Sequence, residues 1–278
     1  MDIQRKPDWL KIKMTHSENF AMVKKIVKEN QLHTICSSGR CPNQSECWSR
    51  GTATFMIMGN ICTRACKFCA TKTGCPFPLD SKEPEKVAES VKLMKLKHCI
   101  ITSVDRDDLD DKGAAHWAAT VKQIREQSPQ IIIELLIPDY EKQLLDVVFA
   151  EKPDIVAHNL ETVKRLTATI RSKASYMKSL QVLKDIAQAG FICKTGIMVG
   201  LGETEQEVLE LFQEVKDTGC RIITIGQYLQ PTKENISVVE YITPAQFVKY
   251  REVALMVGFE SVESAPLVRS SYVKSQKN

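Results

Sequence analysis

The sequence TATFMIMGNICTRACKFC occupies residues 52–69 and joins an apolar run to three closely spaced cysteines. The apolar part, residues 52–59, has the length and composition of a buried strand. Cys62, Cys66 and Cys69 follow in the loop that leaves this strand. Because barrel active sites lie in the loops after the strands, this stretch predicts a reactive or metal-binding loop on the first strand of an α/β fold.

Apolar runs alternate with helical patterns along the rest of the chain. Five further runs are apolar on both faces, as parallel strands covered by helices should be: 99–104, 131–137, 154–158, 192–199 and 221–226. Helical patterns lie between or after them at 85–95, 114–127, 140–150, 175–189, 203–217 and 244–257. Six strand–helix units in series predict a partial (β/α)6 barrel of the TIM type or a doubly wound sheet. Polar residues directly after the strands favour the barrel.

Two segments lie outside this alternation and define the expected domain organisation. Residues 1–51 form an N-terminal extension with three cysteines, residues 52–258 form the barrel core, and residues 259–278 form a C-terminal tail. The tail contains the polar run RSSY at 269–272.

Composition narrows the class of protein. The 278 residues carry a formal net charge of +4, which is too small and too mixed in sign to indicate a nucleic-acid partner. No run of 18 apolar residues exists, so no transmembrane helix is expected. The first residues lack the apolar region of a secretory signal, which predicts a cytoplasmic protein. Thiols stay reduced in that compartment, so clustered cysteines favour metal binding or catalysis.

Seven of the ten cysteines lie between residues 36 and 75. Cys62, Cys66 and Cys69, here called the loop cysteines, can converge on one metal centre and leave a coordination position open. A structural zinc site is the alternative, but it needs a fourth ligand, usually from a second Cys/His pair. A [4Fe–4S] cluster on three thiolates instead leaves one iron free to bind a substrate or cofactor.

Cys36, Cys41 and Cys47, here called the upstream cysteines, precede the first strand at looser spacing. They can hold a second cluster or a structural zinc ion, or they can be incidental thiols. Cys75 is close to both sets and has no assigned role. The three remaining cysteines lie in or beside apolar strands and are expected in the core: Cys99, Cys193 and Cys220.

Polar residues follow four of the predicted strands and are candidates for binding a polar cofactor. Since strand ends meet at one mouth of a barrel, these residues are expected to converge. They are Ser103, Asp105, Arg106, Asn159, Glu161, Gly202, Glu203 and Gln227. Two alternatives stay open, because residues 105–108 can be a solvated charge run and GLGET at 200–204 can be a simple turn. Arg171 can meet a carboxylate or lie on the surface. His158 is better explained as a core histidine than as a catalytic base.

Eight blocks of the sequence, in order, resemble the lipoyl synthase family of the radical S-adenosylmethionine (SAM) superfamily. The three-cysteine loop after the first strand is the signature of the superfamily, and its pairing with the upstream cysteines indicates the family. The blocks are KPDWLK at 6–11, CSSGRCPNQSEC at 36–47, TATFMIMGNICTRACKFC at 52–69, TSVDRDDL at 102–109, HNLETV at 158–163, GLGET at 200–204, TIGQYLQPTK at 224–233 and PLVRSSY at 266–272.

The resemblance implies an enzyme that inserts two sulfur atoms at C6 and C8 of a protein-bound octanoyl-lysine chain. It implies two [4Fe–4S] clusters. The loop cysteines hold the cluster that cleaves SAM, and the upstream cysteines hold an auxiliary cluster that donates the sulfur. A serine of the RSSY run is implied as the fourth, oxygen ligand of the auxiliary cluster, with Ser270 preferred and Ser271 as the alternative.

The resemblance also implies partners. The octanoyl group is carried by lipoyl domains of 2-oxoacid dehydrogenase E2 subunits or by the glycine cleavage H protein, and an electron donor such as flavodoxin or ferredoxin is required. No nucleic-acid or membrane partner is implied. The competing interpretations are a biotin synthase, a methylthiotransferase and a non-catalytic zinc-binding protein. The upstream cysteines, together with the serine-containing tail, argue against the first two.

Overall fold

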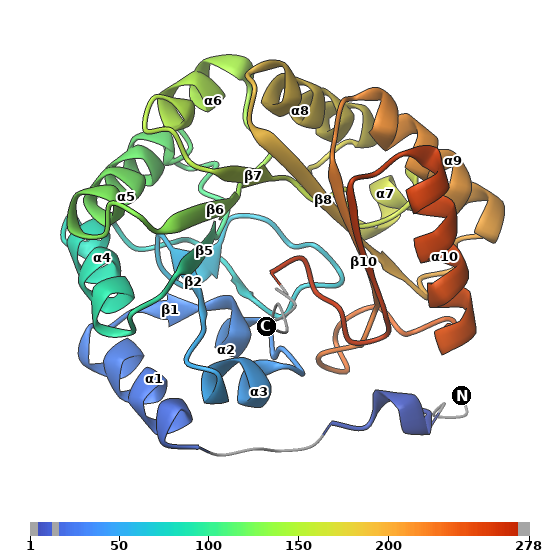
Figure 1. The fold of residues 1–278 in the computed structure, drawn as a ribbon, viewed down its shortest axis with the longest axis horizontal. Helices are drawn as coiled ribbons and strands as arrows, with labels where there is room; N and C mark the ends of the chain where they lie inside the picture. The colour runs from blue at the N-terminus through green and yellow to red at the C-terminus, as the bar shows by residue number, and fades with distance from the viewer. Residues whose placement is uncertain (1–4, 13–16, 272–278) are drawn as a thin grey trace.

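The computed structural model describes residues 5–12 and 17–271. In this part of the chain eight strands form one sheet, which curves into an open barrel with helices on its outer face (Figure 1). Neighbouring strands from β2 to β10 are parallel, and β1 pairs antiparallel with β2. The predicted partial α/β barrel is therefore confirmed. The strands are β1 (His33–Thr34), β2 (Thr54–Ile57), β5 (His98–Ser103), β6 (Ile132–Leu136), β7 (Ile155–Ala157), β8 (Ile192–Val199), β9 (Ile222–Gln227) and β10 (Ser261–Ser264).

All six predicted helices are present, with ends within two residues of the expected positions. They are α4 (Glu83–Leu93), α5 (Ala114–Gln127), α6 (Lys142–Phe149), α8 (Tyr176–Gln188), α9 (Glu205–Asp217) and α10 (Pro244–Val257). Local sequence fixes several of these ends. A capping box between Thr204 and Glu207 starts α9, and Gly258 ends α10 in the left-handed conformation.

Several elements are not among the predicted ones. In the N-terminal extension these are the 3-10 helix η1 (Asp8–Leu10), α1 (Glu18–Glu29), α2 (Ile35–Ser38) and α3 (Gln44–Ser49). Within the barrel core they are β3 (Ile61–Cys62), β4 (Lys72–Thr73) and α7 (Lys164–Ile170). Strand β10 lies in the C-terminal tail and extends the parallel sheet beside β9. The first part of the tail therefore belongs to the barrel wall.

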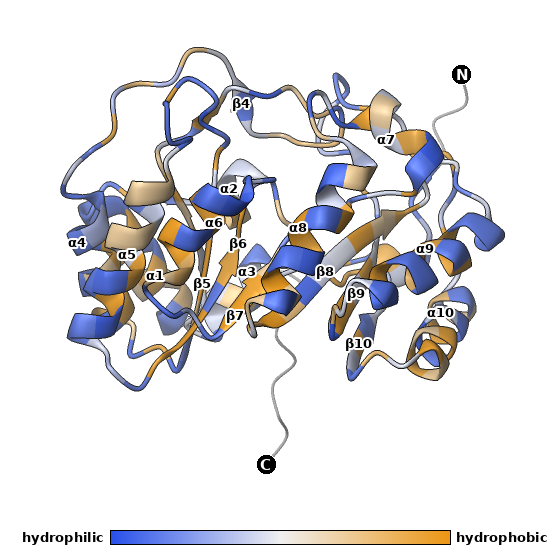
Figure 2. Ribbon diagram, turned by 90° about the horizontal axis from the view of Figure 1, so that it is seen from above, coloured by the Kyte–Doolittle hydropathy of each residue, from blue (hydrophilic) through white to orange (hydrophobic). Residues whose placement is uncertain are grey.

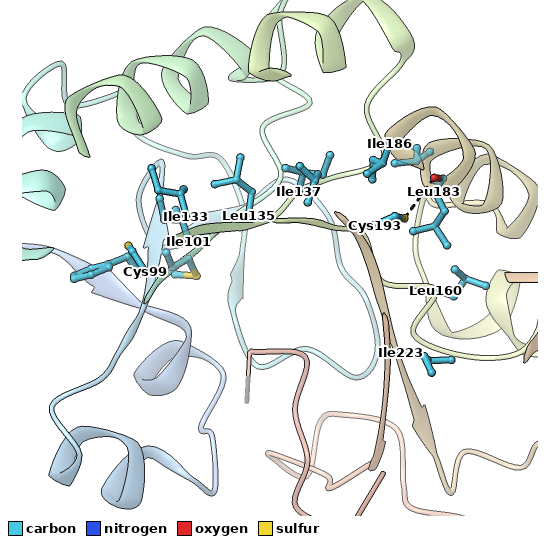
Figure 3. Packing of buried hydrophobic residues seen from close by; sticks show 14 of the residues in the cluster. Cys99, Ile101, Ile133, Leu135, Ile137, Leu160, Leu183, Ile186, Cys193 and Ile223 are labelled. Carbon is cyan, nitrogen blue, oxygen red and sulfur yellow. Dashed lines mark hydrogen bonds between the residues drawn. The ribbon is translucent and has the colours of Figure 1, made fainter. Parts of the chain in front are cut away.

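The hydrophobic core lies between the sheet and the helices (Figure 3). Side chains on this face of the strands are fully buried, among them Cys99, Ile101, Ile133, Leu135, Cys193 and Ile223. Cys220 is buried as well, so the three cysteines expected in the core are there. The residues that alternate with them line the inside of the barrel, among them Thr102, Leu136 and Thr224. This alternation with period two separates a packed outer face from an inner face that is free to build a site.

After β10 the chain turns back and runs along the inner face of the barrel. Asn43 Nδ2 donates to the carbonyl of Leu267 at 2.7 Å, which ties the tail to the upstream cysteine segment. A Cβ atom at Gly226 would lie 2.1 Å from the carbonyl oxygen of Val268. Glycine at that position of β9 is what lets residues 265–271 lie against the sheet.

Candidate active site

The loop cysteines lie between β2 and β4, at the end of the barrel toward which the parallel strands point (Figure 2). Three backbone N–H groups donate to their sulfur atoms. Arg64 N and Asp105 N lie 3.4 and 3.3 Å from Cys62 Sγ, and Thr71 N lies 3.4 Å from Cys69 Sγ. Burial raises the pKa of the Cys62 thiol to about 12. Metal binding at this thiol therefore has to displace a proton at neutral pH.

Arg64 lies between the first two loop cysteines and ties the loop to the ends of two strands. Its guanidinium is 2.8 Å from Asp107 Oδ1, 2.5 Å from Asp139 Oδ1 and 3.5 Å from Asp105 Oδ1, and only 8% of its side chain is exposed. Hydrogen bonds from Arg64 hold the pKa of Asp107 well below its usual range. Because the pKa is lowered in the folded state, this stabilisation is present above about pH 4 and is lost as the pH falls further.

Replacing Arg64 with alanine is expected to destabilise the folded protein by about 3–5 kcal/mol, because the carboxylates lose a shared, buried counter-ion. Arg165→Ala is the matched control, since Arg165 pairs with Glu207 at the exposed surface and such pairs contribute little. Urea denaturation of the anaerobic proteins, followed by circular dichroism, measures both variants. Equal losses of stability in the two would contradict a structural role for the Arg64 network.

A cavity of about 270 Å³ opens inside the barrel beside the loop cysteines. The structure brings eight of the predicted site residues to the wall of this first cavity. They are Cys62, Cys66, Cys69, Ser103, Asp105, Asn159, Glu161 and Ser270. Residues from the ends of β5 and β7, from the cysteine loop and from the tail therefore meet at one place.

Three polar atoms on the wall of the first cavity are buried and have no hydrogen-bond partner among the described residues. They are Ser103 Oγ, Asn159 Oδ1 and Arg171 Nε. Burying a polar group without a partner costs free energy, which a bound ligand with donors and acceptors offsets. The residues present therefore suit a polar ligand that lies against the loop cysteines.

Glu161 is held on this wall in a backbone conformation that is uncommon for a residue with a side chain. Its φ angle is +67°, and its backbone bonds to Gly196 and Met198 of β8 at 3.1 and 2.9 Å. Its Oε1 accepts a hydrogen bond from Asn159 Nδ2 at 3.1 Å. Burial raises the pKa of the Glu161 carboxyl. Such strained and buried groups concentrate at functional sites, which supports the predicted role of this pair.

Arg106 and Gln227 lie away from the first cavity. Arg106 Nη2 pairs with Asp108 Oδ2 at 2.8 Å and holds the turn after β5. Gln227 is fully buried, donates to the carbonyl of Glu240 at 2.9 Å and accepts from Ile242 N at 2.8 Å. Both side chains are therefore occupied by contacts with nearby parts of the chain and do not face the first cavity.

Gly202 and Glu203 also lie away from the first cavity. The Glu203 carboxylate accepts from the backbone N–H groups of Gly200 and Leu201 at 2.5 and 2.9 Å. The carbonyl of Gly202 accepts from Arg165 Nη2 at 2.8 Å. The GLGET block thus forms a self-bonded turn before α9, which is the simpler of the two interpretations of its sequence.

His158 is a satisfied core histidine, as expected. Its ring nitrogens lie 3.0 Å from the Ile137 carbonyl and 2.9 Å from Ser179 Oγ, and burial lowers its pKa to about 4. Arg171 donates to the same Ser179 hydroxyl at 2.8 Å. Arg171 is therefore buried, and it faces the first cavity rather than the surface.

The upstream cysteines line a second cavity of about 670 Å³. Cys36 belongs to α2, Cys47 belongs to α3, and Cys41 lies between these helices. Burial raises the pKa of all three thiols, that of Cys47 to about 12. Arg269 lines the same cavity, and its positive charge favours the thiolate form of Cys41.

The two serines of the tail differ in whether they line the first or the second cavity. Ser270 lines the first cavity, whereas Ser271 lines the second together with all three upstream cysteines. Both serines also line a third cavity together with Cys41, so the preference for Ser270 as the partner of the upstream cysteines stays a prediction. Tyr272 lies outside the described residues.

A third cavity of about 360 Å³ touches both cysteine sets. Cys69 contributes to its wall from one set and Cys41 from the other, with Arg269 beside them. Leu136 and Met198 supply apolar surface from the inner face of the barrel. The third cavity is thus mostly apolar and is bordered by one cysteine from each set.

Cys75 is exposed. Within residues 5–12 and 17–271, no three His, Cys, Asp or Glu side chains are grouped tightly enough to hold a single metal ion. No helix in the same ranges is long and apolar enough to cross a membrane.

Three residues at these sites have no role of their own assigned from the sequence. Asp139 follows the end of β6, so the expectation that polar residues after barrel strands line the site could have identified it. Arg64 lies inside the cysteine motif, but nothing local reveals its carboxylate partners. Arg269 borders all three cavities, which depends on the path of the tail inside the barrel.

Residues 56–215, more than half of the chain, match the family model of the Radical SAM superfamily. Solved structures share the fold. The chain aligns with methylornithine synthase at a TM-score of 0.59 and 12% identity, covering 94% of this chain and 82% of that one. It aligns with the FeFe-hydrogenase maturase HydG from Carboxydothermus hydrogenoformans at a TM-score of 0.60 and 13% identity. That alignment covers 90% of this chain and 76% of HydG. The open barrel and its three-cysteine loop define a radical SAM enzyme.

Sequence identity to curated relatives shows which family within the radical SAM superfamily the chain belongs to. The chain is 59% identical to the lipoyl synthase of Parabacteroides distasonis over 270 residues, which is 96% of each protein. It is 52% identical to the lipoyl synthase of Treponema denticola over 271 residues, covering 97% of this chain and 93% of that one. The chain belongs to the lipoyl synthase family. SAM and a [4Fe–4S] cluster follow as its cofactors from the superfamily.

Proposed function

We propose that this enzyme inserts two sulfur atoms at C6 and C8 of a protein-bound octanoyl-lysine chain, and that a second, auxiliary [4Fe–4S] cluster supplies the sulfur. The loop cysteines hold the cluster that acts on SAM. The upstream cysteines hold the auxiliary cluster. The two metal sites then have separate tasks, of which one opens C–H bonds and the other provides sulfur.

The apolar third cavity between the two cysteine sets carries this proposal. An octanoyl chain has no polar group near C6 or C8, so it requires an apolar passage that brings these carbons near both sites. Leu136 and Met198 offer that surface, with Cys69 and Cys41 at the two sides. A zinc-binding interaction protein has no need for such a passage.

SAM fits the first cavity because it presents an amine, a carboxylate, a ribose and an adenine to polar groups that lack partners. Ser103, Asn159 and Arg171 supply the buried unpaired atoms, and Glu161 supplies a buried carboxyl group. When bound, the cluster and SAM supply a radical able to remove hydrogen from an unactivated carbon, which acid–base chemistry does not achieve. Arg64 fixes the cysteine loop for this step, and Phe68, which lines the first and third cavities, excludes water.

The auxiliary site is proposed to take its fourth ligand from the tail. The lining of the second cavity supports Ser271 in this role, with Ser270 as the alternative. Arg269 offers a positive charge beside Cys41, which suits an anionic cluster. Asn43 holds the tail in place through the Leu267 carbonyl.

The proposed function also defines the partners. The substrates are octanoylated lipoyl domains of 2-oxoacid dehydrogenase E2 subunits or the glycine cleavage H protein, and a flavodoxin or ferredoxin supplies electrons. No nucleic acid or membrane takes part, and the reaction takes place in the cytoplasm.

Anaerobic turnover with an octanoyl-lysine peptide tests the proposal. With SAM and a chemical reductant, the peptide is expected to gain two sulfur atoms while SAM is converted to 5′-deoxyadenosine. The same peptide without the octanoyl group is the control and is expected to gain none. Mass spectrometry of the peptide gives the result, and cleavage of SAM with an unchanged octanoyl chain would overturn the proposed function.

A further inference from the structure

Ser179 is a fully buried residue of α8. A buried serine in a helix commonly bonds back to a backbone carbonyl of the preceding turn. The Ser179 hydroxyl instead lies between two side chains from other parts of the chain, 2.9 Å from His158 Nε2 and 2.8 Å from Arg171 Nη1. Packing alone does not require a hydroxyl at this position, so its role lies with these two partners.

The hydrogen bonds around Ser179 run in one direction. The Ile137 carbonyl can only accept, so His158 Nδ1, which lies 3.0 Å from it, carries the ring proton. Burial keeps the imidazole neutral by lowering its pKa to about 4, so Nε2 is an acceptor. The Ser179 hydroxyl therefore donates to Nε2, and its lone pairs are left for Arg171, whose guanidinium can only donate. His158 thus fixes the direction in which the Ser179 oxygen accepts.

Arg171 carries a buried charge without a close counter-ion. Its surface is 9% exposed, and it forms no ion pair with an Asp or Glu among the described residues. Glu161 feels this charge, but burial still raises the pKa of its carboxyl, so it does not act as a full counter-ion. Arg171 lines the first cavity, and its buried Nε has no partner in the described part of the chain. Because buried charges are normally paired, an anionic group is expected to reach Arg171 from this cavity.

The contact with Ser179 decides which edge of the guanidinium is left for a ligand. Arg171 Nη1 is held by the Ser179 hydroxyl and, at 3.4 Å, by the carbonyl of Leu160. The edge formed by Nε and Nη2 is then the one that remains, and the unpartnered Nε belongs to it. A guanidinium binds a carboxylate best through two parallel N–H groups on one edge. SAM carries such a carboxylate, and a small misplacement of a contact of this kind weakens it steeply.

We infer that Ser179 is a positioning residue for SAM, and that its hydroxyl, oriented by His158, holds Arg171 so that the Nε edge meets the SAM carboxylate. This inference rests on the proposed function, which places SAM in the first cavity. Ser179 does not touch the cofactor, and its effect passes through Arg171. Only a ligand that carries the carboxylate should therefore lose affinity when the Ser179 hydroxyl is removed.

The test measures ligand binding to the full-length, anaerobically reconstituted protein without reductant, so that SAM is bound but not cleaved. Isothermal titration calorimetry gives Kd for SAM and for decarboxylated SAM, which lacks only the carboxylate. Ser179→Ala is expected to raise Kd for SAM about ten-fold and to leave Kd for decarboxylated SAM within about two-fold. In an Arg171→Ala background, Ser179→Ala is expected to have no further effect on the binding of SAM.

Ser90→Ala is the matched control. Ser90 is also a fully buried helix serine, its hydroxyl accepts a hydrogen bond from Asn30 Nδ2 at 2.9 Å, and it lines none of the three cavities. Its replacement should change neither dissociation constant. If Ser179→Ala does not fold, Ser179→Cys takes its place, because a thiol is similar in size and only a weak acceptor, and the same direction of change is expected.

Equal losses of affinity for the two ligands in the Ser179 variant, or no loss for SAM, would overturn this inference alone. A further loss for SAM in the Arg171→Ala background would also overturn it, since Ser179 would then act by another route. Failure of the unsubstituted protein to bind SAM would instead overturn the placement of SAM in the proposed function.

Discussion

Alanine at any one of Cys62, Cys66 or Cys69 is expected to lower the rate of SAM cleavage by more than about a thousand-fold, or about 4 kcal/mol of transition-state stabilisation. Each thiolate binds one iron, and two thiolates do not hold a cluster with a single open iron in place. The loop also loses an anchor, because Cys62 receives two backbone hydrogen bonds and Cys69 a third. Anaerobic formation of 5′-deoxyadenosine in the presence of reductant measures the effect.

Cys75→Ala is the matched control for these variants. Cys75 lies six residues after Cys69 but is exposed, and it lines none of the three cavities. Its replacement removes a thiol from the same region and is expected to leave cleavage of SAM unchanged. Normal cleavage in any loop-cysteine variant, or a comparable loss in Cys75→Ala, would show that the loop cysteines do not hold the reactive cluster.

Alanine at Cys36, Cys41 or Cys47 is expected to have the opposite effect, which is loss of product with SAM cleavage retained. Formation of the sulfur-containing product should be abolished, while SAM cleavage stays within about ten-fold of normal because the first cavity and its cysteines are intact. Iron content should fall by about half, since two clusters of equal size are proposed. Product is measured by mass spectrometry of the octanoyl-lysine peptide, and cleavage is measured as deoxyadenosine in the same samples.

The tail serines provide a matched pair for the same experiment. Ser271→Ala should behave like the upstream cysteine variants, because Ser271 lines their cavity. Ser270→Ala should retain the auxiliary cluster, because Ser270 lines the first and third cavities but not the second, where the three upstream cysteines meet. Loss of SAM cleavage in the upstream variants would mean that the two cysteine sets do not have separate tasks.

Much of the barrel is predictable from the sequence because its strands are buried on both faces. Runs such as 192–199 are mostly apolar and have the length of a buried strand, and the helices between them carry clear stop signals such as Gly258. Strand β10 is different, because of its four residues only Val262 is buried. It is a strand because β9 offers an unpaired edge, which no local pattern in residues 261–264 reveals.

The candidate site is predictable where one residue type in a fixed spacing is enough. The two cysteine sets meet that condition, whereas Asn159 and Glu161 are predicted from their place after a strand. Which serine faces the upstream cysteines depends instead on how residues 265–271 pass along the barrel, which is a contact between distant parts of the chain. Gln227 follows a strand end as the rule requires, yet its side chain bonds to the backbone around residues 240–242. Position at a strand end does not fix the direction of a side chain.

The isotopic origin of the sulfur in the product tests the central claim most directly. The two clusters are rebuilt with ³⁴S-labelled sulfide, free sulfide is removed, and one round of turnover is run with the octanoyl-lysine peptide in unlabelled buffer. If the protein's own auxiliary cluster is the donor, both sulfur atoms of the product carry ³⁴S, and no more than one labelled product forms per chain. Product that contains unlabelled sulfur would contradict the account.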